Sequence, residues 1–268
     1  MRILPHLFLL FLLSAVEPLR AEGETPSAPA AEEVMRRVRD NLPQSPLVMR
    51  GELRSGPLRG GFDHTYYVEI RLDLGRRPMT ADYILRDRFG GVLEQMRVLR
   101  HGPAEVDLRY TKGDQPASDT PPPPHEHIQA TDVAWDDLTL SFLWWPATRL
   151  IGRDTFRGRD CLVLELAPQN AAPAAADAAT AGAGLPETRR LWVDEKMFVF
   201  LQMEVWLADR SARRLMVRCF KKIGEQWMIK DLEMRALGLS HRTLLRVEEM
   251  SGLPETAAPA EEGASSNQ

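Results

Sequence analysis

The sequence predicts a mainly β domain of the α+β class, with about eleven antiparallel strands and only short helices. Three observations support this class. Apolar and polar residues alternate in many short segments of the chain, as they do in half-buried strands. Short connections join these segments, which favours antiparallel pairing between successive strands. Apolar residues recur at helical spacing in only two segments.

The clearest predicted strand is residues 64–73, where Tyr66, Val68 and Ile70 fall on one face and Glu69 on the other. A Gly-Gly pair after Phe89 predicts a hairpin turn between two further strands. The remaining candidate strands are residues 47–54, 80–87, 92–100, 105–110, 151–156, 160–167, 188–194, 198–207, 214–223, 227–236 and 242–249.

Several of these strands are apolar on one face only, and such a face must be covered. In residues 198–207, for example, Leu201 and Met203 are predicted to share the apolar face. The few short helices cannot cover so many strands. The sheet therefore either closes around its own filled interior or stays half open over an apolar cavity. The residues alone favour the filled interior.

The N-terminus predicts export. A positively charged start precedes an apolar run at residues 3–16, which is shorter than the roughly 20 residues of a transmembrane helix. This pattern is typical of a secretory signal peptide cleaved after Ala21 or Ala15, with an uncleaved anchor as the alternative. The predicted parts of the chain are a signal peptide (1–21), a linker (22–29), one folded domain (30–252) and a disordered polar tail (253–268).

The two helical segments differ in character. Residues 30–41 predict a short amphipathic helix that Pro43 ends. In residues 128–146, Leu138, Phe142 and Trp145 recur at helical spacing, and Pro146 stops the element. Thr131 or Asp132 is predicted to cap this second helix. It is either a movable lid over a cavity or a fixed plug of the sheet, and the residues alone favour the plug.

Other functional classes find little support. Asp132 and Asp136 share a helical face, but capping explains them without catalysis. His125 and His127 lie in a proline-rich loop, and a catalytic zinc site needs a third ligand on a rigid frame. No motif of a hydrolase, nucleotide-binding protein or metalloprotease occurs. The net charge of -4 gives no basic face for nucleic acid. We therefore predict no enzyme activity, no cofactor, no metal and no nucleic acid.

The two cysteines are predicted to be unpaired, although an exported protein meets oxidising conditions. Cys161 is expected to face away from the buried Leu162 and Leu164 of its strand. Cys219 is expected to share the buried face with Val217. These alternations place the two thiols on opposite faces of the sheet.

Most of the chain, from about residue 30 to 250, resembles the LolA-like outer-membrane lipoprotein-sorting protein family, and especially its uncharacterised periplasmic branch. The motifs that carry this resemblance are Thr131-Asp132-Val133 with Asp137-Leu138, Phe142-Leu143-Trp144-Trp145-Pro146, Gly158-Arg159-Asp160-Cys161, Leu191-Trp192-Val193-Asp194 and Phe220-Lys221-Lys222-Ile223. Each motif is short, but their order and spacing together are specific.

The resemblance implies a half-open antiparallel β-barrel with short lid helices and a cavity for acyl chains. It implies a monomeric periplasmic carrier that takes lipoproteins from an inner-membrane lipoprotein-releasing transporter to an outer-membrane acceptor. The alternative is a sensing module of the same fold that binds lipids or lipoproteins without shuttling them. The residues predicted to contact the acyl chains are Leu138, Phe142, Leu143, Trp144 and Trp145 in the lid and Val68, Ile70, Leu201 and Met203 in the strands. The resemblance also implies a lid-latching arginine, to which no position in this sequence is assigned.

Overall fold

The computed structural model describes residues 30–120, 122–123, 126–167, 187–207, 210–223 and 226–252. The predicted signal peptide, linker and C-terminal tail lie outside these residues. The described part of the chain forms one sheet of twelve strands in which all paired neighbours are antiparallel. No helix among the described residues is long and apolar enough to span a lipid bilayer.

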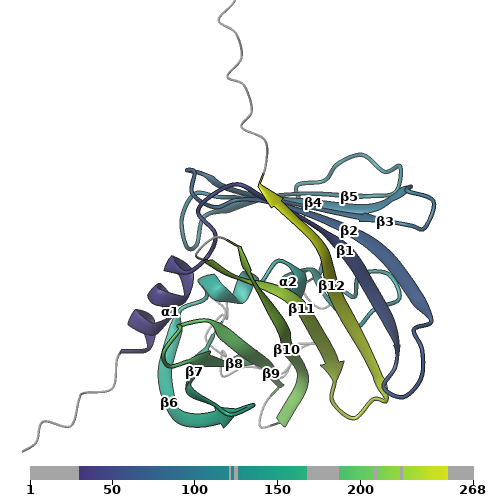
Figure 1. The fold of residues 1–268 in the computed structure, drawn as a ribbon. Coiled ribbons are helices and arrows are strands. Elements are labelled where there is room, and N and C mark those ends of the chain that lie inside the picture. Colours follow the sequence, from purple (N-terminus) through teal and green to yellow (C-terminus); the bar gives the residue numbers. More distant parts are fainter. Residues whose placement is uncertain are drawn as a thin grey trace, which may run out of the picture.

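The sheet consists of two meanders joined side by side (Figure 1). The first contains β1 (Leu47–Pro57), β2 (His64–Asp73), β3 (Met79–Arg86), β4 (Val92–Arg100) and β5 (Val106–Lys112). The second contains β6 (Ala147–Phe156), β7 (Arg159–Leu166), β8 (Glu187–Asp194), β9 (Phe200–Leu207), β10 (Arg210–Ile223), β11 (Gln226–Ala236) and β12 (His241–Gly252). β12 returns to pair with β1, while β5 and β6 are the two edges. The mainly β class and the half-open barrel that the resemblance implied are confirmed, whereas the filled interior that the residues alone favoured is not found. The described residues form twelve strands, which correspond to the twelve candidate ranges, although the barrel was expected to have about eleven.

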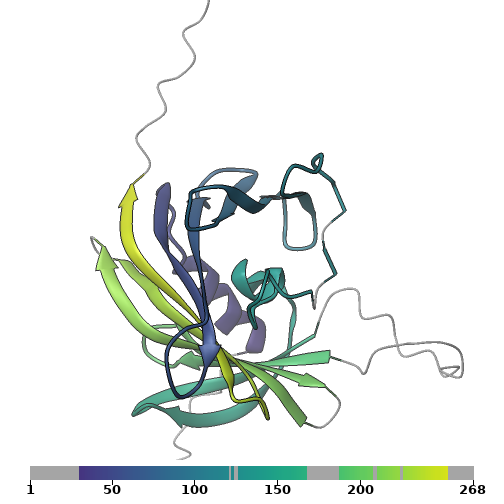
Figure 2. The same cartoon turned by 90° about the vertical axis from the view of Figure 1, so that its right-hand side faces the viewer.

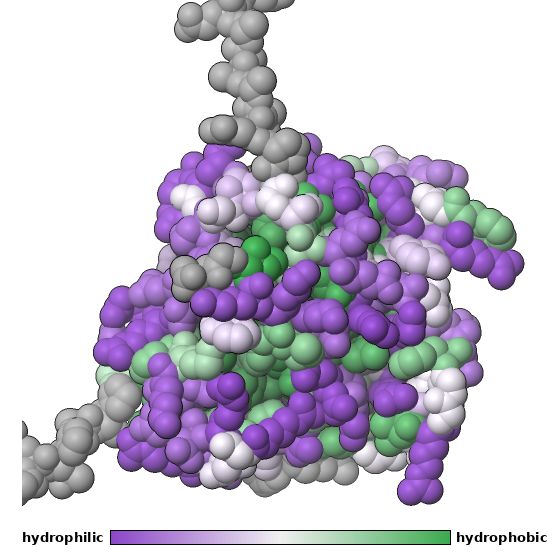
Figure 3. All heavy atoms as spheres, in the orientation of Figure 1, coloured by the Kyte–Doolittle hydropathy of each residue, from purple (hydrophilic) through white to green (hydrophobic). Residues whose placement is uncertain are grey.

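The alternation of residue types places the core on the concave side of this curved sheet. Val68 and Ile70 in β2, Leu164 in β7 and Met203 in β9 belong to one large buried cluster. The face of the molecule turned to the viewer in Figure 1 is mainly hydrophilic, with apolar side chains visible between the polar ones (Figure 3). An antiparallel sheet with one packed face has this division.

Helix α1 (Ala31–Asp40) matches the predicted helix of residues 30–41 and packs beside β6. Its apolar stripe buries Val34, Met35 and Val38. On the opposite side, Arg36 forms exposed ion pairs across one helical turn, as surface helices commonly do. The helix thus covers part of the core near one edge of the sheet.

The segment between β5 and β6 crosses from one edge of the sheet to the other and runs along its concave side (Figure 2). It carries two single-turn helices, α2 (Trp135–Leu138) and η1 (Ser141–Trp144). The prediction of one continuous helix is wrong, because Leu140 has a φ of 51° and this left-handed backbone interrupts the right-handed helix. We call residues 126–146 the crossover.

The cap of α2 also differs from the prediction. Neither Thr131 nor Asp132 caps it, because the helix begins later, with Ala134 as its N-cap. The carboxylate of Asp137 accepts a hydrogen bond of 3.1 Å from the Ala134 N–H and satisfies this first backbone donor.

Register irregularities in β9 and β10 change the predicted faces of these two strands. The pairing of β8 with β9 skips Leu201, so that Phe200 and Met203 face the core. Leu201 instead joins a second, smaller cluster with Cys161, and the predicted shared face of Leu201 and Met203 is wrong. In β10 the pairing is irregular around Cys219.

Both cysteines are free, as predicted. The expected reason is wrong, because the bulge in β10 lets Phe220, and not Cys219, follow Val217 on the core side. Strands β8 and β9 lie between the two thiols. Three strand spacings of about 4.8 Å exceed the Cα separation of about 7 Å that a disulfide can bridge.

We expect the two thiols to differ in reactivity. Cys161 is fully buried, and burial raises the pKa of its thiol, whereas Cys219 is partly exposed. Because the thiolate is the reactive form, iodoacetamide should label Cys219 first in the folded protein. Mass spectrometry after timed labelling measures this order. In urea without reductant both thiols should be labelled, and protection of the pair until reductant is added would contradict the separation of β7 from β10.

Candidate ligand-binding cavity

A cavity of about 550 Å³ lies between the concave face of the sheet, helix α1 and the crossover. Its volume falls within the range of roughly 300 to 1,000 Å³ that is usual for small-molecule sites. Apolar side chains from both meanders line it, among them Met49, Leu72, Tyr83, Met96, Val98, Phe200, Phe220 and Ile229. Such a surface offers burial to an apolar ligand with few polar contacts.

The five predicted lid residues divide into two groups. Leu143, Trp144 and Trp145 line the cavity. Leu138 and Phe142 do not, because both are buried in the main core, where Phe142 packs edge-on against Phe200 with 5.7 Å between the ring centres. The crossover therefore presents one aromatic side to the cavity and uses the other as part of the core.

The four predicted strand residues all lie outside the cavity lining. Val68, Ile70 and Met203 are buried in the main core, and Leu201 lies in the second cluster. The cavity lies instead against β3, β4 and the start of β11, where Tyr83, Met96 and Met228 line it. The alternation of apolar and polar residues in 80–87 and 92–100 indicated an apolar face in these strands. Periodicity does not distinguish the residues of such a face that pack in the core from those that line a cavity.

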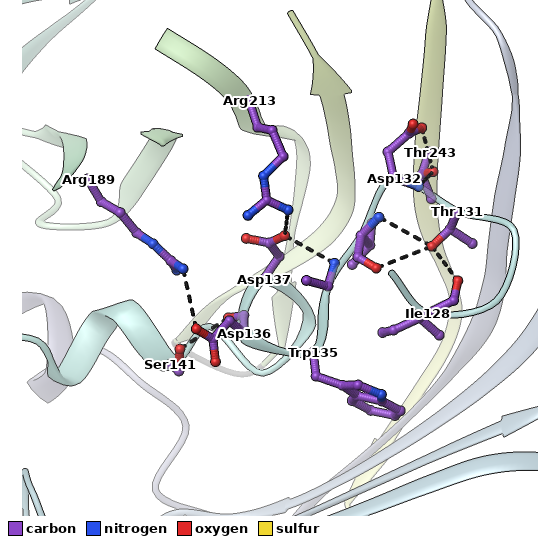
Figure 4. A network of polar contacts seen from close by, with 12 residues as sticks. Ile128, Thr131, Asp132, Trp135, Asp136, Asp137, Ser141, Arg189, Arg213 and Thr243 are labelled. Atoms are coloured by element: carbon purple, nitrogen blue, oxygen red, sulfur yellow. Dashed lines mark hydrogen bonds and ion pairs between the residues drawn. The ribbon is translucent and has the colours of Figure 1, made fainter. Parts of the chain in front are cut away.

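A buried ion pair holds the crossover to the second meander (Figure 4). Asp137 is fully buried, and its Oδ2 accepts a hydrogen bond of 2.8 Å from Nη1 of Arg213 in β10. The Asp137 Oδ1 and Arg213 Nη2 atoms are buried without a hydrogen-bond partner in the structure. Removal of either partner is therefore expected to destabilise the fold, because the other charge would remain buried without a counterion.

A second arginine connects the crossover to β8 and to the cavity wall. Arg189 is almost completely buried, and its Nη2 lies 3.4 Å from Oδ2 of Asp136. Its guanidinium carbon lies 4.1 Å from the centre of the Trp145 ring, a cation–π geometry. Burial raises the pKa of the Asp136 carboxyl, although the charge of Arg189 opposes this shift. Arg189 thus fixes the position of an aromatic side chain that lines the cavity.

The first part of the crossover is bound to the strands on either side of the β1–β12 junction. The Asp132 carboxylate accepts one hydrogen bond of 2.9 Å from the Thr243 hydroxyl in β12 and lies 2.7 Å from Nδ1 of His241. The indole N–H of Trp135 donates to Glu94 in β4 at 3.1 Å. Asp132 and Asp136 thus bind different strands and do not form a pair.

Metal binding has no support in the described residues, which contain no group of three or more potential ligands positioned for an ion. His125 lies outside these residues. Glu126, its neighbour, forms an ion pair of 3.3 Å with Lys112.

Half-open antiparallel sheets of this kind occur in several solved structures that are similar to this chain. The chain is similar to a DUF1329 family protein from Desulfovibrio piger, with a TM-score of 0.65, 12% identity and coverage of 83% of this chain and 91% of that one. It is similar to a domain from Vibrio parahaemolyticus named for outer membrane lipoprotein sorting, with a TM-score of 0.62, 12% identity and coverage of 86% and 94%.

A LolA superfamily protein from Nitrosomonas europaea gives a TM-score of 0.58 at 14% identity and covers 85% of this chain and 96% of its own. A family model described as "uncharacterized protein" matches residues 123–255, slightly less than half of the chain. Comparison with curated protein sequences gives no match. At these identities the likeness concerns the fold, and the chain is LolA-like in fold, as the resemblance in sequence implied.

Proposed function

We propose that this protein is a periplasmic carrier that binds the acyl chains of lipoproteins in its cavity and sorts lipoproteins toward the outer membrane. The observation that carries the proposal is the apolar cavity of about 550 Å³ between the sheet and the crossover. An acyl chain that leaves a membrane exposes apolar surface to water at about 0.8 kcal/mol per CH₂ group. A preformed apolar cavity offsets this cost without requiring specific contacts to the chain.

Several observations support a carrier. The N-terminal sequence has the pattern of a signal peptide, which fits export to the periplasm. Similar folds occur in a protein named for outer membrane lipoprotein sorting and in a LolA superfamily protein. A carrier requires a donor and an acceptor, for which we propose an inner-membrane lipoprotein-releasing transporter and an outer-membrane receptor. The carrier itself acts as a monomer, without cofactor and without catalysis.

A transfer assay tests the carrier directly. Donor vesicles that contain the releasing transporter and a labelled lipoprotein are incubated with the purified protein. We expect the label to enter the soluble fraction in a stoichiometric complex with the protein and then to pass to outer-membrane vesicles. The matched control is the same assay with the acyl groups of the lipoprotein removed. No soluble complex with the acylated cargo would contradict the carrier function.

A sensing module of the same fold is the second candidate. The observation that favours it is the attachment of the crossover, which bonds to strands of both meanders through Asp137, Asp132 and Trp135. A binding cavity whose covering segment is attached in this way suits a protein that holds a lipid without a large opening movement. Stable binding of the acylated cargo without release to acceptor membranes would favour this function over the carrier.

The indoles of Trp144 and Trp145 provide a simple measure of binding, since both line the cavity. We expect their fluorescence to shift to shorter wavelength when an acylated peptide replaces water in the cavity, because indole emission follows the polarity of its surroundings. Titration with the acylated peptide measures the affinity, and the peptide without its acyl chain is the control. An unchanged spectrum at saturating cargo would place the ligand elsewhere.

A further inference from the structure

The cavity contains one charge whose role the binding of a neutral chain does not explain. Arg100 is the last residue of β4, is 9% exposed and lines the cavity. Among the described residues of the lining, only Arg100 and Asp136 carry a charged side chain. A cation in such a surface is costly unless an anion accompanies it.

The two charges differ in how they are neutralised. Asp136 has Arg189 as its partner. Arg100 donates one hydrogen bond of 2.9 Å, from Nη1 to the Pro103 carbonyl, and its guanidinium carbon lies 4.4 Å from the centre of the Trp144 ring. Within the described chain, no carboxylate forms an ion pair with it. Burial lowers the pKa of Arg100 to about 10, so the side chain remains charged at neutral pH.

The geometry of this arginine suits an incoming anion. A guanidinium carries five N–H donors in a planar fork, and Arg100 uses one of them in the hydrogen bond of 2.9 Å to the Pro103 carbonyl. Contact with the Trp144 ring restrains the guanidinium group. Carboxylates and phosphates accept two parallel hydrogen bonds from such a fork. The apolar lining around it then accommodates the chain that is attached to the anionic group.

We infer that the cavity selects amphiphiles in which an apolar chain ends in an anionic carboxylate or phosphate head, and that Arg100 binds this head. The inference rests on the proposed function, since it requires that an acyl chain occupies the same cavity, and it goes beyond that function, since the acyl chains of a lipoprotein end in uncharged ester or amide bonds. It adds a residue that determines specificity and a class of ligand. Both sources of the head, a fatty acid and a phospholipid or alkyl phosphate, share the chemistry that Arg100 recognises.

The test compares three ligands with the same apolar chain: dodecanoate, dodecyl phosphate and the uncharged methyl ester of dodecanoate. Dissociation constants are measured at pH 8 by tryptophan fluorescence and by calorimetry. We expect the native protein to bind at least one anion about tenfold or more tightly than the ester, because charge-assisted bidentate hydrogen bonds form only with the anion. The tighter of the two anions identifies the source of the head.

Arg100→Gln should remove the preference for the anion and leave the affinity for the ester within about threefold, since the apolar lining is unchanged. The matched control is Arg97→Gln in the same strand, because Arg97 is half exposed, pairs with Asp82 on the surface and should not affect the preference. Arg100→Lys keeps the positive charge but loses the planar set of donors, and it should retain part of the preference for the anion over the ester. Thermal unfolding of each variant confirms that it is folded.

Two results would overturn the inference. Equal affinity of the native protein for the ester and both anions would do so, and this measurement needs no variant. If folded Arg100→Gln still binds the anion more tightly than the ester, a residue other than Arg100 binds the anionic head. In either case binding of the ester would leave the proposed function standing, whereas failure of all three ligands to bind would end both.

Discussion

Asp137→Ala is expected to lower the free energy of unfolding by about 3 to 5 kcal/mol, the usual cost of removing one partner of a buried ion pair. Asp137 is fully buried and Arg213 nearly so, and 2.8 Å separate their bonded atoms. The substitution leaves the Arg213 charge buried without a counterion. It also removes the acceptor of the Ala134 N–H at the start of α2. Urea denaturation of the purified variant measures the loss.

Two further variants test whether the unpaired charge of Arg213 causes this loss of stability. Asp137→Ala combined with Arg213→Met removes both charges and should recover most of the stability, because an apolar pair of similar volume often replaces a buried ion pair at little cost. Asp40→Ala, at an exposed ion pair of α1, should change stability little. If the double variant is as unstable as Asp137→Ala, the unpaired charge is not the cause of the loss.

Much of the fold was predictable because most strands have one packed face. The predicted strand of residues 64–73 coincides with β2 (His64–Asp73), where Val68 and Ile70 are buried in the core. Strand β6 begins at Ala147, four residues before its predicted start at residue 151. It is an edge strand with little buried surface, so its sequence carries no alternation that would mark its beginning.

The errors arose where tertiary contacts override the local pattern. Leu140 adopts a left-handed backbone that no propensity of leucine favours, and it divides the predicted lid helix into α2 and η1. Leu201 leaves the core face because a bulge in β9 adds one residue to the strand. A bulge changes every face after it, and apolar residues on both sides of this strand concealed its position.

The cavity was implied by the family resemblance and not by the residues alone, which favoured a filled interior. The run Leu143, Trp144 and Trp145 stood out in the sequence because its large apolar surface needs a partner, and these three residues line the cavity. The strand residues of the cavity were missed, since a filled and an unfilled region of one apolar face have the same periodicity. Arg100 was missed because a charged residue at the end of a strand normally marks its exit to solvent.

The core-facing and cavity-facing sides of the crossover are expected to differ in their contributions to stability and to ligand binding. Phe142→Ala is expected to lower the free energy of unfolding by about 3 to 5 kcal/mol, because it leaves a void in a packed core. Phe142 is fully buried against Phe200 and under Arg189. Trp144→Ala should have a smaller effect on stability, since Trp144 is partly exposed and faces an existing cavity.

Ligand affinity should follow the opposite order. Trp144→Ala removes apolar surface from the cavity wall and should weaken the binding of an acylated peptide by about tenfold or more, which corresponds to about 1.4 kcal/mol. Phe142→Leu keeps the core filled and serves as the matched control, with a stability loss below about 1.5 kcal/mol and unchanged affinity. Urea denaturation and titration with the acylated peptide measure the two quantities in each variant. A folded Trp144→Ala with native affinity would show that the aromatic side of the crossover is a plug of the barrel and not part of the binding surface.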